Sequence, residues 1–221
     1  MVRNRIAIAL SVVAVSCFCA VAASGQNINQ YLQNIEGTLS VNSEPYMTNG
    51  ELTGCQLTFD SLHRDYAYRQ GNYIKVSGAV GIMVGQENRL GAIVKVTVHA
   101  LNETENGPVF EPSPPSRGYL IGSDLKTNVD SLVVSDLSDT PGALFSVYAL
   151  SPTMEIVLEG LQTGRLTFAF NQNGGPSDIR LPVELNVFKT DEFGNKMRSD
   201  ETVRAFAKCV LALTQSAGSK G

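Results

Sequence analysis

Two long runs of alternating apolar residues occupy the middle of the chain, over residues 74–84 and 90–100. Their apolar members are Ile74, Val76, Val80, Ile82, Val84, Leu90, Ala92, Val94, Val96, Val98 and Ala100, with Gly78 at the one missing place. Period two over this length is typical of strands that bury one face of a sheet. Because only residues 85–89 separate the runs, they predict an antiparallel hairpin at the centre of the fold.

Further strands are predicted on both sides of this hairpin. The segments are residues 55–59, 119–121, 132–134, 144–150, 166–170 and 179–187. Pro182 indicates that the last of them lies at a sheet edge or a bulge, and four prolines between Asn106 and Gly118 predict a long surface loop. We therefore expect a mainly β fold, an antiparallel β-sandwich or partly open barrel of about eight to ten strands.

Helical spacing is confined to three segments. Residues 27–36 predict a short helix, and residues 151–164 predict a middle helix with Ser151 as its cap and Gly164 as its stop. A C-terminal helix should begin at Ser199 or Asp200 and bury a stripe of apolar residues against the sheet. The stripe consists of Val203, Phe206, Val210 and Leu213. Residues 26–215 then form a single β-rich domain, followed by a disordered tail over 216–221.

The N-terminal 25 residues have the three parts of a secretory signal peptide. Arg3 and Arg5 form a basic head, residues 6–23 carry no charge, and residues 20–22 read Ala-Val-Ala, a small-residue cleavage site. The alternatives are an uncleaved membrane anchor and a lipoprotein that is processed at Cys17. We expect cleavage and export to a bacterial periplasm or the extracellular space, with no membrane span afterwards.

Export decides how the cysteines and charges are interpreted. Cys17 and Cys19 leave with the signal, so Cys55 and Cys209 remain and predict one disulfide in an oxidising compartment. Removal of Arg3 and Arg5 leaves 15 basic against 21 acidic residues, a net charge of −6 with His neutral. This balance, without a Lys or Arg cluster, argues against nucleic acid as a partner.

No motif in the sequence predicts catalysis, a cofactor or a metal site. Ser123 and Lys126 fit S-x-x-K, but the accompanying S-D-N and K-T-G elements of penicillin-binding enzymes are missing. The triplet His63-Arg64-Asp65 matches a kinase loop only by accident, because the chain is too short for a kinase. Asp136 and Asp139 lie close in sequence but provide too few oxygen ligands for calcium.

One segment mixes side chains that could grip an anionic or sugar ligand. Its candidate residues are His63, Arg64, Asp65, Tyr66 and Tyr68. An ordinary solvated turn explains the same composition, and we prefer that interpretation. The chain has no Trp, which further lowers the expectation of sugar binding.

Residues 164–170 and 179–187, followed by a closing helix, are similar to bacterial periplasmic proteins of the invasion-associated locus B type. The similarity covers less than a third of the chain and implies no function.

Our leading interpretation is a binding or interaction module of the cell envelope whose partner is an unknown envelope protein or small ligand. The alternatives are a secreted hydrolase with a dispersed acidic site and a lipocalin-like carrier. A cleft with facing ionisable groups would favour the hydrolase. An open sheet edge would favour the binding module. A closed barrel with an apolar cavity would favour the carrier.

Overall fold

A computed structural model of the protein describes residues 28–85, 89–190 and 196–218. The chain divides into two units, Met1–Ile35 and Glu36–Gly221. In the first unit residues 28–34 are helical, as predicted, and the amide of Ile35 donates to the carbonyl of Leu32 at 3.3 Å. The predicted signal peptide lies outside the described residues.

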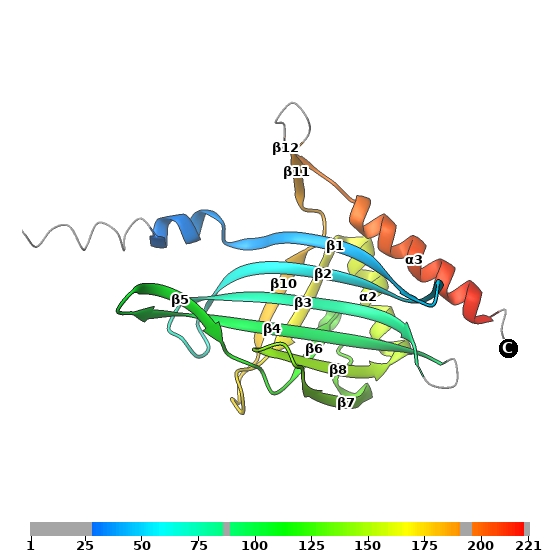
Figure 1. The fold of residues 1–221 in the computed structure, drawn as a ribbon, viewed down its shortest axis with the longest axis horizontal. Helices are drawn as coiled ribbons and strands as arrows, with labels where there is room; N and C mark the ends of the chain where they lie inside the picture. Colours follow the sequence, from blue (N-terminus) through cyan, green and yellow to red (C-terminus); the bar gives the residue numbers. More distant parts are fainter. Residues whose placement is uncertain (1–27, 86–88, 191–195, 219–221) are drawn as a thin grey trace, which may run out of the picture. The chain divides into compact units, whose positions relative to one another are not determined.

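A seven-stranded antiparallel sheet forms the larger layer of the second unit (Figure 1). Its strands are β1 (Gly37–Thr48), β2 (Glu51–Asp65), β3 (Asn72–Val84), β4 (Leu90–Thr104), β5 (Gly107–Pro112), β7 (Leu132–Leu137) and β8 (Ala143–Ala149). Their order is β1-β2-β3-β4-β8-β7, and β5 pairs with the far end of β4. The predicted central hairpin is confirmed, since Val84 pairs with Leu90 and Ile74 with Ala100.

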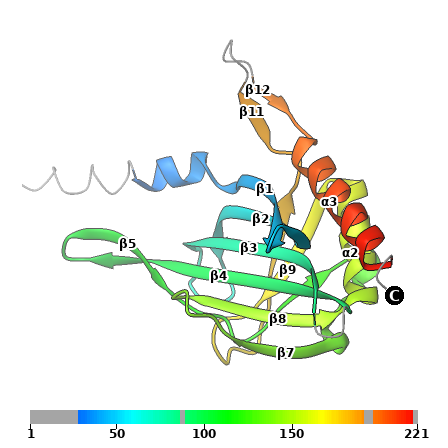
Figure 2. The ribbon, with the colours of Figure 1, turned by 45° about the vertical axis from the view of Figure 1, so that its right-hand side comes forward.

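The second layer combines a small sheet with two helices. The small sheet has the order β10-β9-β6 and consists of β10 (Ile179–Glu184), β9 (Arg165–Phe170) and β6 (Gly118–Ile121). The helices are α2 (Leu150–Thr163) and α3 (Glu201–Gly218), and β11 (Phe188–Thr190) and β12 (Lys196–Arg198) make a separate ribbon. Figure 1 shows β10, β6 and α2 behind the strands of the large sheet, and Figure 2 shows β9 behind them and α2 beside their right-hand ends. The mainly β, two-sheet fold with a middle and a C-terminal helix is thus confirmed.

The core lies between the two layers. Phe59 of β2 and Phe168 of β9 place their ring centroids 4.6 Å apart across it. The ring of Phe59 also covers Gly78, where a Cβ would lie 2.4 Å from the ring. This contact explains why a glycine interrupts the apolar alternation of β3.

The middle helix packs on β9 through another glycine. A Cβ on Gly160 would lie 2.3 Å from Cδ2 of Leu166 and 3.0 Å from the carbonyl oxygen of Arg165. Gly164 ends α2 in the left-handed conformation with φ of 73°, as predicted. The cap position is Ala149 rather than Ser151, because the helix begins at Leu150.

The predicted disulfide is present between Cys55 of β2 and Cys209 of α3, with Cα atoms 5.9 Å apart. Three members of the α3 stripe, Phe206, Val210 and Leu213, are buried. The bond therefore joins the C-terminal helix to the sheet that the helix covers. No helix in the described ranges is long and apolar enough to cross a membrane.

Two further sequence-based predictions need correction. Residues 107–112 form strand β5 and not a loop. The amide of Ser113 donates to the carbonyl of Val98, so the odd-numbered residues of this segment are the ones whose amides donate to β4. Pro108 and Pro112 occupy even positions, where the missing amide is not needed. The predicted tail is also shorter, since α3 continues to Gly218 and residues 219–221 lie outside the described residues.

Candidate functional site

The predicted ligand segment begins with a serine–histidine pair at the end of β2. The Nε2 atom of His63 lies 2.7 Å from Oγ of Ser61, a spacing that also occurs between a nucleophile and its base. Ser61 is fully buried, however, and its hydroxyl donates to the carbonyl of Gly37 at 2.7 Å. Burial lowers the pKa of His63, partly offset by the charge of Glu36. A substrate cannot reach this serine, so the pair has a structural role.

Arg64 points to the opposite face of β2 from His63, because consecutive strand residues alternate. Its guanidinium lies 4.8 Å from the ring centroid of Tyr73 and donates through Nε to the Tyr73 hydroxyl at 3.1 Å. Glu36 completes this cluster with an oxygen 3.5 Å from the same nitrogen. The two basic candidates of the segment therefore do not converge on one ligand.

Asp65 and Tyr68 hold the turn between β2 and β3 in place. One oxygen of the buried Asp65 accepts the amides of Ala67 and Tyr68 at 2.9 Å, and the other accepts the Gln172 side chain at 2.8 Å. The Tyr68 hydroxyl accepts the amide of Ser177 at 3.0 Å. Of the five candidates only Tyr66 is largely exposed, at 74%. Residues 63–65 thus belong to the end of β2 and residues 66–68 to the turn that follows, and four of the five candidate side chains bond to groups inside the protein.

In the S-x-x-K motif the lysine amine is held by a carboxylate of α2. Nζ of Lys126 lies 2.6 Å from a carboxylate oxygen of Glu155. This hydrogen bond raises the pKa of Lys126 and lowers the pKa of Glu155, so both remain charged and the amine is a poor base. Ser123 lies at a cavity between α2, β9 and β10. The cavity has a volume of about 300 Å³.

The charged groups of this cavity are satisfied by protein partners. Glu159 accepts the amide of Ser123 at 2.7 Å, and Arg165 donates to Glu184 at 2.6 Å. In the described ranges no three His, Cys, Asp or Glu side chains gather as a metal site would require. The three charged side chains at this cavity, Glu159, Arg165 and Glu184, thus all have hydrogen-bond partners within the protein.

The strand β7 presents a different kind of surface. It ends the strand order of the large sheet, and among the described residues it pairs only with β8. All six of its residues are exposed. Its large apolar members are Leu132 (47% exposed), Val133 (69%), Val134 (48%) and Leu137 (59%). An exposed apolar edge strand is a template for pairing with another chain.

The second layer of the fold stops short of β7. Leu132 pairs with Tyr148 and Leu137 with Leu144, and cross-strand partners point to the same face of a sheet. Tyr148 and Leu144 are buried, and the Tyr148 hydroxyl donates to Gly118 of β6 at 2.6 Å. The two β7 leucines thus point to the core side of the sheet, yet Leu132 stays 47% and Leu137 59% exposed.

Backbone groups of β7 also point away from β8. The amide of Ser138 donates to the carbonyl of Ala143 at 3.0 Å, so the backbone groups of every second residue of β7, counted from Ser138, bond to β8. By this alternation the amides and carbonyls of Ser135 and Leu137 face the open edge. The amide of Leu137 is held at 2.7 Å by the carboxylate of Asp136. An incoming strand would find one edge donor covered by this carboxylate.

Sequence analysis predicted the strand at residues 132–134 but not its role. Alternation and hydrophobicity do not show whether a strand lies inside a sheet or at its edge. Comparison of the chain with protein-family models, curated proteins and solved structures found no match. The partial similarity to the invasion-associated locus B type therefore has no support from these comparisons.

Proposed function

We propose that the protein is an exported, non-enzymatic binding module of the cell envelope that takes up a partner along β7. The observation that carries this proposal is the exposure of Leu132 and Leu137 on the core side of the sheet. A partner that paired with β7 would bury both leucines and satisfy the open backbone groups, as in other cases of strand addition.

The two alternatives have less support. A hydrolase needs facing ionisable groups that are free to react, whereas Glu159, Arg165 and Glu184 of the cavity are bonded to protein groups. A lipocalin-like carrier needs a closed barrel. In the described part of the chain the large sheet ends at β1 and β7, which do not pair with each other.

Export is supported by two independent features. Residues 1–25 carry the signal-peptide pattern, and a bond between Cys55 and Cys209 persists in oxidising compartments such as the periplasm or the extracellular space. A protein–protein role in the envelope is consistent with both.

Peptide display tests the binding function. A library of displayed peptides is selected against the protein and against the variant Leu132→Ser/Leu137→Ser. The matched control is Leu158→Ser/Leu211→Ser, which changes two exposed leucines on α2 and α3. We expect enriched peptides to bind the parent and the control but not the β7 variant. Peptides that bind all three proteins equally, or no enrichment at all, would refute the proposal.

A further inference from the structure

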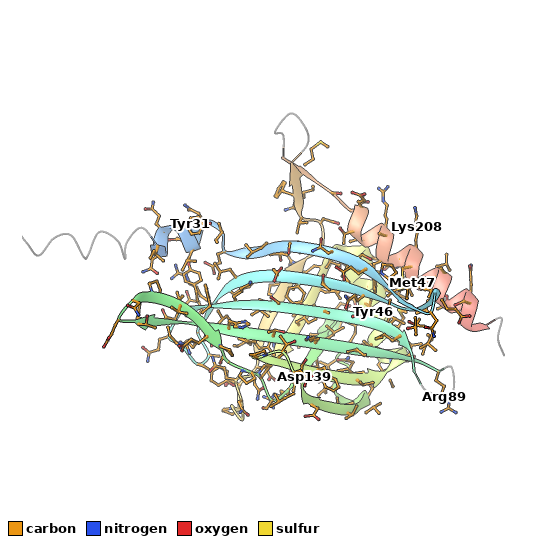
Figure 3. All side chains as sticks on the ribbon, viewed as in Figure 1. Tyr31, Tyr46, Met47, Arg89, Asp139 and Lys208 are labelled. Atoms are coloured by element: carbon orange, nitrogen blue, oxygen red, sulfur yellow. A yellow bond between two sulfur atoms is a disulfide. The ribbon has the colours of Figure 1, made fainter. Side chains whose placement is uncertain are left out.

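The stretch of sequence that contains β7 is acidic. Between residues 122 and 140 the exposed carboxylates are Asp124, Asp130, Asp136 and Asp139. Figure 3 shows Asp139 at the edge of the sheet. The one basic residue of this stretch, Lys126, is paired with Glu155 at 2.6 Å. The stretch therefore has a net charge of −3 from four acids and one base.

No basic side chain in the described ranges forms an ion pair with these four carboxylates. Lys95 of β4, which β8 separates from β7, donates to the Thr140 hydroxyl at 3.4 Å instead. Three of these carboxylates lie directly before, within or directly after β7, namely Asp130, Asp136 and Asp139, and none of them has an ion-pair partner in the described ranges. A second copy of the chain would bring the same charge to the interface, and like charges across an interface are unfavourable.

Asp136 links this charge to the pairing capacity of the strand. Its carboxylate holds the amide of Leu137, one of the groups that face the open edge. A cationic side chain on a docking strand would draw this carboxylate away and release the amide for a backbone hydrogen bond. A neutral or acidic strand would have to displace the carboxylate without such compensation.

We propose, as an extension of the proposed function, that β7 binds an extended segment of another protein in which Lys or Arg alternates with apolar residues. The apolar side chains cover Leu132 and Leu137, the basic ones face the carboxylates around β7, and the backbone extends the sheet by one strand. The segment lies antiparallel or parallel to β7 on the side opposite β8.

Synthetic peptides test the chemistry of the partner. A short fluorescent peptide of alternating Lys and Val is titrated into the protein, and anisotropy is compared with a peptide that carries Glu in place of Lys. A third peptide keeps the Lys–Val sequence but is N-methylated along one backbone edge. We expect the Lys peptide to bind at least about tenfold more tightly than the Glu peptide at low salt, with a smaller ratio at physiological salt. The N-methylated peptide should bind more weakly, because it cannot extend the sheet on that edge.

Charge variants identify the groups responsible. The variant Asp136→Asn/Asp139→Asn should lower the preference for Lys over Glu by about tenfold. The variant Glu103→Gln/Glu105→Gln, which removes two exposed acids at the β4–β5 turn, is the matched control and should keep the preference. The aspartates are exposed, so a normal unfolding midpoint is expected for both variants.

The outcomes separate this inference from the function on which it rests. If Lys and Glu peptides bind equally and both lose affinity in Leu132→Ser/Leu137→Ser, the basic partner is wrong while the binding edge stands. If no peptide binds and the protein is a dimer that the leucine variant dissociates, the occupant is a second copy. If no peptide binds and the protein is monomeric, both the inference and the binding edge are refuted.

Discussion

At the scale of single residues, His63 makes stability depend on pH. Burial lowers its pKa in the folded state below the ordinary value of 6.5. Below pH 6.5 the unfolded chain binds a proton that the folded chain does not, so the stabilisation present above that pH is lost as the pH falls.

We expect His63→Gln to show a smaller loss of stability on acidification than the parent. The measurement is the urea midpoint of unfolding across this pH range. The control is Gln162→Asn on α2, an exposed substitution that changes no titratable group and should retain the slope of the parent. An unchanged slope in His63→Gln would show that other groups cause the acid sensitivity.

Gly160 gives a second residue-scale prediction. Alanine is favoured over glycine inside a helix by about 1 kcal/mol, but its Cβ would meet Leu166 at 2.3 Å. Overpacking of this kind costs about 1–3 kcal/mol. Gly160→Ala should therefore lower the free energy of unfolding, measured by denaturant titration, whereas exposed Gln162→Ala on the same helix should change it little. A stabilised Gly160→Ala protein would contradict the close packing of α2 on β9.

The role of a glycine could be predicted from the sequence only where it depends on the local backbone. Gly164 could be recognised as a helix stop, because a left-handed end favours glycine locally. Gly78 and Gly160 could not be explained from sequence, since the rings and side chains that exclude a Cβ come from Phe59 and Leu166 elsewhere in the chain.

At the scale of elements, the disulfide fastens α3 to β2. The bond joins residues 154 positions apart, and the chain-entropy model assigns about 5 kcal/mol to a loop of this length. We expect Cys55→Ala/Cys209→Ala to lower the melting temperature strongly and to increase amide exchange in α3 first. Lys208→Ala on the exposed side of α3 is the control. A melting temperature equal to that of the parent would show that packing alone holds the helix.

Which elements could be predicted depended on their hydrophobic pattern. The strands β3, β4 and β9 and the helices α2 and α3 were predictable because each buries a regular apolar face. Strand β1 was missed, because only Val41 among its residues is buried and its sequence lacks a clear alternation. Strand β5 was missed because its prolines suggest a loop, although an edge strand tolerates them at alternate positions.

At the scale of the whole molecule, the candidate site follows from the way the two layers fit together. The pairing of Cys55 with Cys209 could be predicted from the sequence, whereas the contacts that hold the candidate side chains of residues 63–68 inside the protein could not. β7 is exposed because the second layer ends at β8. The sequence of residues 132–137 does not indicate where that layer ends. Sheet order was the missing information.

Export can be tested on the native protein at this scale. The intact mass should correspond to a chain that lacks about the first 25 residues. A mass equal to the full chain would refute cleavage, and a mass that begins at Cys17 with added acyl groups would indicate a lipoprotein.

If β7 is the binding edge, its amides should exchange more slowly with solvent when a peptide is bound. Amide exchange is measured by mass spectrometry with and without a peptide selected for binding. We predict slower exchange in residues 132–138 on binding, above all at Ser135 and Leu137, whose amides face the open edge. Protection at the cavity around Ser123 instead, with residues 132–138 unchanged, would contradict the account.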